Sequence, residues 1–374
     1  MGQSTNSSLR RNKPPFRGDH VGSLLRPKSV QKARSQKGAG NITAEDLRQI
    51  ENEAITDLVK KQKETGLQTV TDGELRRSFW HFDFLENLKG VEGYESDSGI
   101  QFKGNQSKSH SIKVTGKLDF TNHPMLEDFK FLNSLSGDHT AKMTIPSPSM
   151  LHFRGTIDNS IYPDQDELFE DLAKTYQKAI QAFYDAGCRY LQLDDTSWAY
   201  LCSKEQREQM RDRGLNPEEL SSLYAKTINQ ALEGRPDDLK TTMHICRGNF
   251  RSTWIASGGY EPVAETLFDG LSIDGFFLEY DSDRAGDFQP LRFVKRKDLQ
   301  IVLGLITSKF GDLEDPDEIK KRIDEASHFV DLNQLCLSPQ CGFASTEEGN
   351  LLTEEQQWAK LRHVAEISRD VWNF

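Results

Sequence analysis

Apolar residues follow two alternating patterns along the chain, from about residue 16 to the C-terminus. In three long segments they recur every three or four positions, which is the spacing of one face of a helix. We therefore expect helices over residues 43–66, 164–186 and 353–372. A Thr or Asp opens each segment, and such side chains favour helix N-termini because they accept hydrogen bonds from free backbone N–H groups.

Short runs rich in Val, Ile, Leu and aromatic residues lie between the helical segments and predict strands. Several of them, such as Ile-Val-Leu-Gly-Leu-Ile at 301–306, are apolar without interruption, as expected for strands that are buried on both faces. The eight predicted strands are 16–23, 68–74, 142–149, 190–196, 241–246, 275–280, 300–307 and 334–339.

The order of these elements predicts the fold class. Seven of the eight strands lie next to a helical segment in a strand-then-helix rhythm, and eight such units predict an α/β fold, specifically a closed (β/α)₈ TIM barrel. A doubly wound open sheet is the alternative. Residues 90–119 break the rhythm with a Gly/Ser-rich stretch followed by alternation, which predicts a β-hairpin insertion after the second strand.

The domain organisation that we expect is a flexible N-terminal tail at residues 1–15 and a single barrel domain at residues 16–374. The interior shows no internal repeat and no linker. No stretch reaches the roughly 18 uncharged apolar residues of a membrane span, and the polar N-terminus lacks the apolar core of a signal peptide. We therefore predict a cytoplasmic protein.

Composition narrows the class of partner. The 374 residues carry 47 Lys and Arg against 58 Asp and Glu, a formal net charge of −11, and no clustered basic surface is visible. This balance argues against nucleic acid as the main partner, because phosphate binding needs clustered positive charge. Five cysteines without an export signal do not indicate a disulfide framework. Small-molecule chemistry is the expectation.

Polar residues gather where six of the predicted strands end. The active site of a barrel enzyme lies at the carboxyl ends of the strands, so six polar ends predict a site there. The strings are Asp-His-Val-Gly-Ser at 19–23, Thr-Asp-Gly-Glu at 71–74, Gln-Leu-Asp-Asp at 192–195, His-Ile-Cys-Arg-Gly-Asn at 244–249, Glu-Tyr-Asp at 279–281 and Ser-Pro-Gln-Cys-Gly at 338–342.

His244 and Cys246 are separated by one residue, so in a strand their side chains point to the same side. His and Cys are ligands that zinc prefers, and Glu279 and Cys341 at other strand ends complete a set of four donors. The alternative is a buried cysteine beside a hydrogen-bonded histidine.

The strings HVGSLLRP, TDGE, QLDD, HICRGN, FFLEYDSDR, VLGLITSK and LSPQCGF, in this order, resemble the catalytic barrel of the cobalamin-independent methionine synthase family, and most closely its short single-barrel relatives. The resemblance implies that His244, Cys246, Glu279 and Cys341 bind Zn²⁺. It also implies that Val21, Gly22 and Ser23, together with the catalytic carboxylates of Glu74 and Asp194, hold the amino acid part of homocysteine.

These implications lead to a zinc-dependent S-methyltransferase that methylates homocysteine to methionine. Only the thiolate is a good nucleophile, and ligation by zinc lowers the pKa of a thiol. Glu74 and Asp194 suit the substrate ammonium group, although both could instead cap the helices that follow. Two alternatives are alkyl transfer to a different thiol and a non-catalytic barrel that binds zinc or an amino acid.

The methyl donor is predicted from two departures from the family pattern. The chain has no room for the additional N-terminal barrel of the full-length synthase, which helps to bind polyglutamylated methylfolate. No histidine stands near Ile306 and Thr307, where the family's acid is expected. We therefore expect a donor with a better leaving group, a methylcorrinoid or a sulfonium compound, or inefficient use of a methylfolate with few glutamates. His20 is a candidate substitute acid, and the aromatic cluster of Trp80, His81 and Phe82 either stacks on a flat donor or covers the rim of the barrel.

Overall fold

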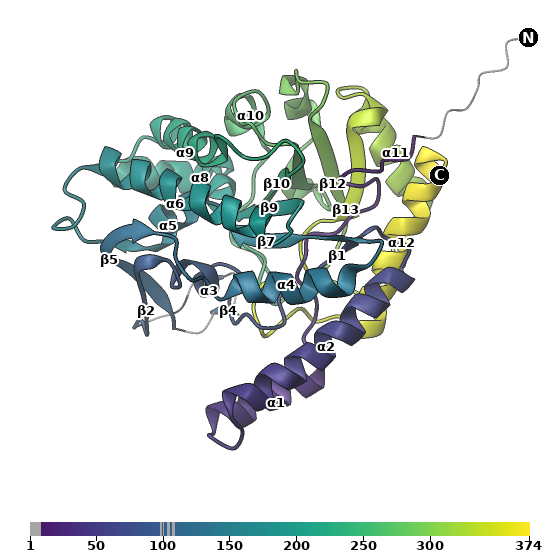
Figure 1. Ribbon diagram of the computed structural model, residues 1–374. Helices are drawn as coiled ribbons and strands as arrows, with labels where there is room; N and C mark the ends of the chain where they lie inside the picture. Colours follow the sequence, from purple (N-terminus) through teal and green to yellow (C-terminus); the bar gives the residue numbers. More distant parts are fainter. Residues whose placement is uncertain (1–8, 98, 100, 103–104, 107–108) are drawn as a thin grey trace, which may run out of the picture.

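Six of the predicted apolar runs form one parallel sheet at the centre of the molecule, in the order β13–β12–β11–β10–β9–β7 (Figure 1). The computed structural model describes residues 9–97, 99, 101–102, 105–106 and 109–374. The strands are almost entirely buried, as their apolar sequences predict, and the α/β class is confirmed. Their bounds are Met143–Pro146 (β7), Tyr190–Asp195 (β9), Lys240–Ile245 (β10), Gly275–Glu279 (β11), Gln300–Ile306 (β12) and Leu335–Pro339 (β13).

The sheet does not close, in contrast to the closed barrel that the sequence predicts. The second predicted strand is reduced to β1 (Thr69–Val70), which pairs in parallel with β6 (Thr140–Ala141). Residues 16–23 contribute one bridge, from Gly18 to Leu337 of β13, and no strand. Within the described part of the chain, no ladder joins residues 16–23 to β1.

Local backbone turns explain the missing ladder. Gly22 and Gly73 have φ values of 145° and 66°, which lie outside the extended range of a strand. Instead of ladder bonds, the Thr71 hydroxyl donates to the carbonyl oxygen of Gly22 at 2.6 Å, and the N–H of Leu24 donates to the carbonyl oxygen of Gly73 at 3.0 Å. The two segments therefore lie side by side without pairing as strands.

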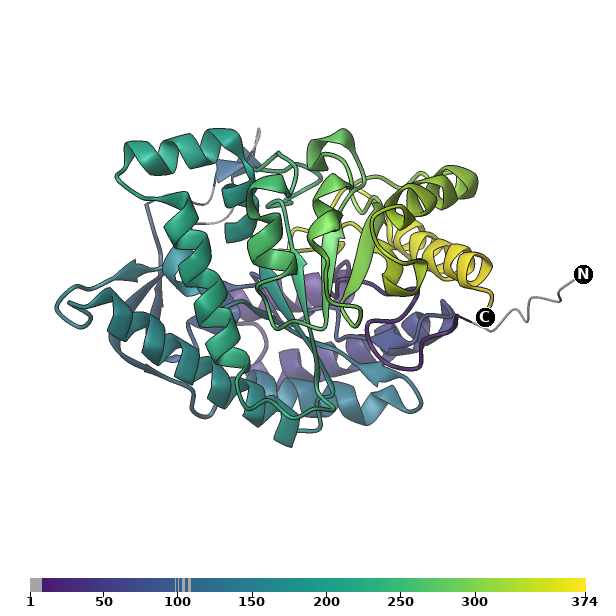
Figure 2. The same cartoon turned by 90° about the horizontal axis from the view of Figure 1, so that it is seen from above.

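Helices surround the sheet (Figure 2). The three predicted long helices are confirmed within two residues as α2 (Ala44–Glu64), α6 (Gln165–Asp185) and α12 (Glu354–Trp372), and the predicted N-terminal Thr and Asp side chains cap them. None of the helices in the described residues is long and apolar enough to cross a membrane. The remaining helices are α1 (Lys28–Gly38), α3 (Phe82–Leu85), α4 (Met125–Ser136), α5 (Ser149–Arg154), α7 (Ser197–Cys202), α8 (Lys204–Asp212), α9 (Pro217–Leu232), α10 (Ala264–Phe268) and α11 (Pro316–Ser327), with 3₁₀ turns η1 (Glu261–Val263), η2 (Asp283–Ala285), η3 (Gln289–Phe293) and η4 (Leu332–Gln334).

A small sheet occupies the region of the predicted hairpin insertion. β2 (Lys89–Tyr94) pairs antiparallel with β5 (Ser111–Asp119), and β5 pairs in parallel with β8 (Thr156–Ile157). Between β2 and β5 lies the short pair β3 (Gln101–Phe102) and β4 (Asn105–Gln106). Residues 98, 100, 103–104 and 107–108 of this region lie outside the described residues, and the insertion itself stays a prediction.

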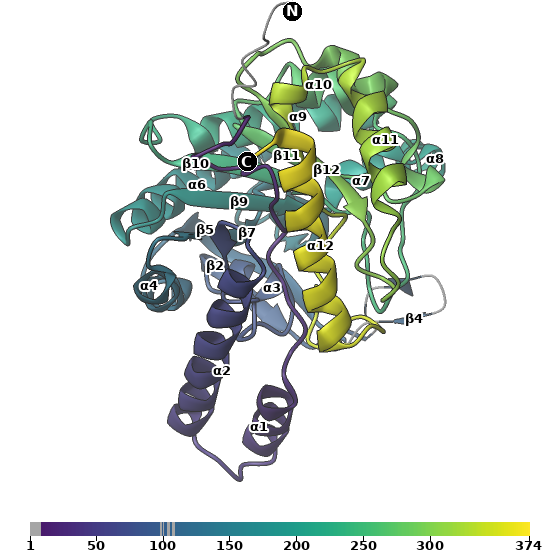
Figure 3. The same cartoon turned by 90° about the vertical axis from the view of Figure 1, so that its right-hand side faces the viewer.

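The start of the described chain lies beside its C-terminal helix. The start of the described chain runs next to α12 in Figure 3, and the N–H of Leu9 donates to the carbonyl oxygen of Trp372 at 3.3 Å. Residues 1–8 of the predicted flexible tail lie outside the described residues. At the other side of the molecule, α1 and α2 form a helical hairpin that projects away from the sheet (Figures 1 and 3).

Candidate active site

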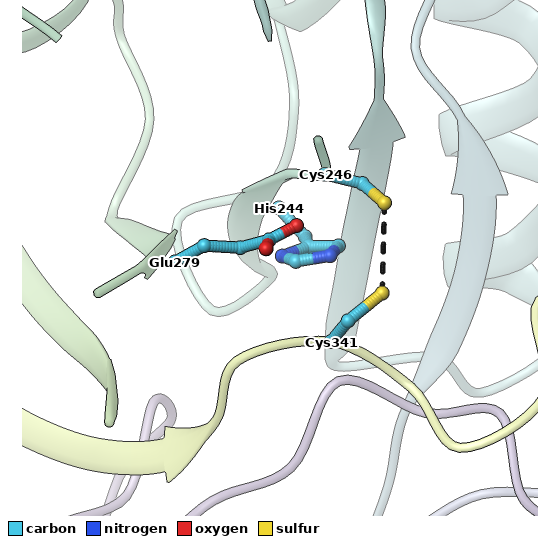
Figure 4. A group of neighbouring side chains, drawn as sticks. All are labelled: His244, Cys246, Glu279 and Cys341. Atoms are coloured by element: carbon cyan, nitrogen blue, oxygen red, sulfur yellow. Dashed lines mark hydrogen bonds between the residues drawn. The ribbon is translucent and has the colours of Figure 1, made fainter. Parts of the chain in front are cut away.

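Four residues predicted as metal ligands lie together at the carboxyl ends of three strands, and we call them the ligand cluster: His244, Cys246, Glu279 and Cys341 (Figure 4). His244 lies in β10 and Cys246 follows it, Glu279 ends β11, and Cys341 follows β13. The register of β10 with β11 pairs His244 with Phe277, which brings the ends of both strands to one level. One donor atom from each residue lies within 4.8 Å of every other, and all four residues are buried.

The two sulfurs of the ligand cluster are close but not bonded. Cys246 Sγ and Cys341 Sγ are 3.5 Å apart, whereas a disulfide bond measures about 2.05 Å. The hydrogen bond from the Cys341 thiol lowers the pKa of Cys246 well below its ordinary value, against the opposing effect of burial. A thiolate is therefore favoured at Cys246, and the thiolate is the form of cysteine that binds metals.

His244 presents one free nitrogen to the cluster. Its Nδ1 lies 3.3 Å from the carbonyl oxygen of Phe277, which fixes that nitrogen as the donor. Its Nε2 is buried and has no hydrogen-bond partner among the residues that the structure describes. A buried nitrogen without a partner is costly, so this atom is available for a ligand from outside the chain.

Neighbouring groups hold Glu279 in one orientation. Its Oε1 accepts hydrogen bonds from the backbone N–H of Arg247 and from Asn249 Nδ2, both at 2.6 Å. Its Oε2 accepts from a guanidinium N–H of Arg284 at 2.7 Å. Burial raises the pKa of Glu279, and the charge of Arg284 opposes this rise. Oε1 therefore has both lone pairs engaged, whereas Oε2 accepts one hydrogen bond and keeps a lone pair for a further ligand.

A pocket opens beside the cluster, and most of the predicted substrate-binding residues line it. Val21, Ser23, Glu74 and Asp194 line it together with His244, Cys246 and Cys341. Gly22 does not line this pocket. It forms the backbone turn described above, between Val21 and Ser23. Trp80, Gly342 and Ser345 complete the wall.

Glu74 and Asp194 face this pocket as two buried carboxylates. Glu74 Oε1 accepts from the Thr144 hydroxyl at 2.7 Å, and its Oε2 has no hydrogen-bond partner in the described part of the chain. Asp194 Oδ1 accepts from Gln192 Nε2 at 2.8 Å. Burial raises the pKa of both groups, that of Asp194 to about 7, and Arg77 opposes the rise at Glu74. Two desolvated carboxylates at one pocket favour a cation between them.

At the start of α7, the helix contacts considered for Asp194 are made by the adjacent Asp195. Asp195 Oδ1 accepts from the Ser197 hydroxyl at 2.7 Å and from the backbone N–H of Trp198 at 3.0 Å, at the start of α7. Asp194 makes no such bond to a helix among the described residues. The adjacent pair therefore divides its roles, with Asp195 bound to the helix and Asp194 directed to the pocket.

His20, the candidate substitute acid, lies away from the pocket. Its Nε2 is 3.3 Å from the carbonyl oxygen of Thr69, and burial together with the charge of Lys142 lowers its pKa to about 4. Two cationic side chains, Lys309 and Arg76, form ion pairs with Asp281 at 2.5 Å and with Asp128 at 3.4 Å.

Some residues of the site carry no signal in the sequence. Arg284 follows Glu279 by five positions, yet only the path of the loop brings its guanidinium onto the carboxylate. Ser345 comes after the quoted strand end and lies 3.9 Å from Cys341 Sγ through its hydroxyl. Thr144 sits in an apolar strand and binds Glu74 from there. All three lie outside the polar strand ends, and the string FFLEYDSDR includes Arg284 without indicating its contact with Glu279.

Comparison with known proteins gives the family. The model of the catalytic domain of the cobalamin-independent synthase matches residues 17–367. The chain belongs to the cobalamin-independent methionine synthase family.

Relatives within this family cover nearly the whole chain. The Bacillus subtilis protein YxjG, which is uncharacterized, is 65% identical over 98% of this chain and 97% of its own length. The crystal structure of a Listeria monocytogenes protein assigned as a vitamin-B12-independent methionine synthase has a TM-score of 0.82 and 54% identity, over 97% of this chain and 99% of that one. A B12-independent methionine synthase from Shewanella sp. W3-18-1, solved with selenomethionine, has a TM-score of 0.70 and 20% identity over 95% and 98%, and shares the fold.

Proposed function

We propose that this protein is a zinc-dependent S-methyltransferase that moves a methyl group to the sulfur of homocysteine and so forms methionine. One observation carries the proposal: three residues of the ligand cluster and the carboxylates of Glu74 and Asp194 face the same pocket. Membership of the cobalamin-independent methionine synthase family supports methyl transfer to homocysteine.

The ligand cluster fits zinc by its chemistry. Two sulfurs, one imidazole nitrogen and one carboxylate oxygen are donors that zinc prefers, and His244 Nε2 has no other partner among the described residues. His244, Cys246, Glu279 and Cys341 would hold the ion. Bound there, zinc would lower the pKa of a substrate thiol and keep its sulfur nucleophilic at neutral pH.

The other side of the pocket fits the amino acid part of homocysteine. The Glu74 and Asp194 carboxylates would bind the ammonium group, because a cation removed from water needs opposite charge and hydrogen bonds. The Ser23 hydroxyl and the backbone of Val21 and Gly22 would bind the carboxylate group of homocysteine. A Cβ at Gly342 would lie only 1.9 Å from Ser23 Oγ, so a glycine is needed there to leave Ser23 in place.

The test of the proposed function is product formation with a panel of thiols and donors. The zinc-loaded protein is expected to make methionine from homocysteine, with a kcat/KM at least about 100-fold above that for cysteine or 2-mercaptoethanol, because the two carboxylates and Ser23 bind only the larger amino acid thiol well. Methylfolate with one and three glutamates, methylcobalamin and a methylsulfonium compound serve as donors. Methylation of other thiols only would contradict the proposal, as would tight ligand binding without product.

Asp194→Asn is expected to weaken homocysteine binding about 10- to 100-fold, since a charge-assisted hydrogen bond contributes roughly 1.5–3 kcal/mol. Zinc content is expected to stay at the wild-type level, because Asp194 is not part of the ligand cluster. Isothermal titration with homocysteine and metal analysis measure the two effects. Asp158→Asn, at an exposed carboxylate, is the matched control. An unchanged homocysteine affinity in Asp194→Asn would limit Asp194 to a structural role.

A further inference from the structure

A second pocket adjoins the pocket beside the ligand cluster. Trp80, Cys246 and Ser345 line both pockets, so the two spaces meet beside a sulfur of the ligand cluster. The walls of the second pocket also include His81 and Arg154. A methyl donor must approach the substrate sulfur from a space next to the thiol site, and this pocket offers such a space.

His81 is a buried histidine with both ring nitrogens free. It is 3% exposed, and neither Nδ1 nor Nε2 has a hydrogen-bond partner among the described residues. Its ring is stacked between Trp80, with centroids 4.5 Å apart, and Phe82, with centroids 3.9 Å apart. The aromatic neighbours therefore hold the imidazole in place without using its nitrogens.

Other buried histidines of the chain differ from His81 in this respect. His123 Nε2 lies 3.0 Å from the carbonyl oxygen of Phe84, and His20 and His244 each have one nitrogen near a backbone carbonyl oxygen. Leaving two buried nitrogens without hydrogen-bond partners is costly, because neither regains the hydrogen bond that it made to water. A residue kept in that state beside the thiol site has the features of a group that exchanges protons with a ligand.

We propose that His81 carries the proton of the methyl transfer, from the thiol of the acceptor to the departing nitrogen of an N-methyl amine donor. The inference rests on the proposed function. The S–H bond breaks as the neutral imidazole takes the proton, and the sulfur electron pair then forms the S–CH₃ bond. The C–N bond breaks with its electron pair on nitrogen, and the imidazolium returns its proton there. The products are the thioether and the demethylated amine, and His81 is neutral again.

The surroundings of His81 suit the protonation of the amine. Burial, with smaller contributions from the charges of Arg154 and His110, lowers the pKa of His81 well below its ordinary value. Once protonated, the residue is a stronger acid than an ordinary histidine and readily protonates an amine nitrogen, which is a poor leaving group without a proton. A low pKa makes proton uptake less favourable, so the first half of the step depends on a thiol whose own pKa is lowered at the ligand cluster, as in the proposed function. His81 would thus supply an acid although no histidine stands near Ile306 and Thr307.

Donors with different leaving groups test the role of His81. An N-methyl tetrahydropteroyl donor needs a proton on its departing nitrogen, whereas methylcobalamin and a methylsulfonium compound leave without one. With homocysteine fixed, His81→Gln and His81→Ala are expected to lower kcat about 10²- to 10⁴-fold for the amine donor. For the other two donors the change is expected to stay within about threefold. Added imidazole is expected to restore part of the amine-dependent rate in His81→Ala.

Two controls separate proton transfer from damage to the fold. Zinc content and homocysteine affinity, measured without a donor, are expected to match the wild type in both variants, and His139→Gln, which lines neither pocket, is expected to keep all rates. An equal loss with all three donors, or no loss with the amine donor, would overturn the role of His81 alone. A wild-type protein that uses only the proton-independent donors would overturn it too. If the wild type forms no methionine with any donor, the proposed methyltransferase itself is wrong and the role of His81 falls with it.

Discussion

Cys341→Ser is expected to weaken zinc binding by more than about 100-fold and to remove measurable methionine formation, and His244→Ala is expected to do the same. Loss of groups that merely orient metal ligands already costs 10- to 100-fold in affinity, and these two variants remove a ligand atom itself. A serine oxygen is a poorer donor to zinc than a thiolate. Cys341→Ser therefore keeps the size and shape of the side chain and removes the thiolate ligand. Metal analysis after dialysis against a weak chelator and competition with a zinc dye measure the affinity.

The matched control is Cys188→Ala, which also removes one buried thiol. Cys188 Sγ donates to the carbonyl oxygen of Tyr190 at 3.3 Å and lies outside the ligand cluster. This variant is expected to lose stability, because its thiol is fully buried, and to keep one zinc per chain. Since zinc binds only the folded chain, added zinc is expected to raise the melting temperature of wild type and Cys188→Ala, and not of Cys341→Ser. Full zinc occupancy in both Cys341→Ser and His244→Ala would show that these residues do not bind zinc.

The ligand cluster could be predicted from the sequence because its members stand at strand ends. A single intervening residue places His244 and Cys246 on one side of a strand, and parallel strands in register bring their carboxyl ends together. Nothing in the sequence, however, indicates which side chains complete the site from the loops. Arg284 binds Glu279 through the fold of a 3₁₀ turn, and the free nitrogens of His81 result from the absence of partners in three dimensions.

The fold could be predicted to the level of a parallel α/β sheet and its long helices. Short runs rich in apolar residues, some of them uninterrupted, predict the six central strands, and N-terminal capping residues mark the long helices within two residues. The first two predicted strands fail because apolar patterning does not record backbone turns. Gly22 and Gly73 adopt positive φ, and the hydroxyl of Thr71 replaces a ladder bond. Both glycines are followed directly in the chain by residues that line the pocket beside the ligand cluster, Ser23 and Glu74.

Lys142→Met is expected to lower the free energy of unfolding by about 3–5 kcal/mol, since it removes one partner of a buried ion pair and leaves the other charge unpaired. Lys142 Nζ lies 3.3 Å from Asp19 Oδ1, and both side chains are 0% exposed. The ammonium group also donates to the carbonyl oxygen of His20 and, at 3.1 Å, to Gln192 Oε1. Methionine has a similar length and fills the space. The decrease in the free energy of unfolding therefore measures the contribution of the charge and its hydrogen bonds. Urea unfolding followed by circular dichroism measures the change.

The exposed pair Lys174 and Glu170, 2.7 Å apart, provides the control, because Lys174→Met removes the same charge from a solvent-screened site and is expected to leave the free energy of unfolding nearly unchanged. A second consequence reaches the substrate pocket through Gln192. Lys142 fixes the carbonyl end of this amide, and the other end donates to Asp194 Oδ1 at 2.8 Å. Without Lys142 the amide loses its fixed orientation, so weaker homocysteine binding is expected to accompany the loss of stability while zinc content stays unchanged. If Lys142→Met lost no more stability than Lys174→Met, the buried pair would contribute nothing to folding. If Lys142→Met lost stability but kept homocysteine affinity, Asp194 would hold its position without the contact between Lys142 and Gln192.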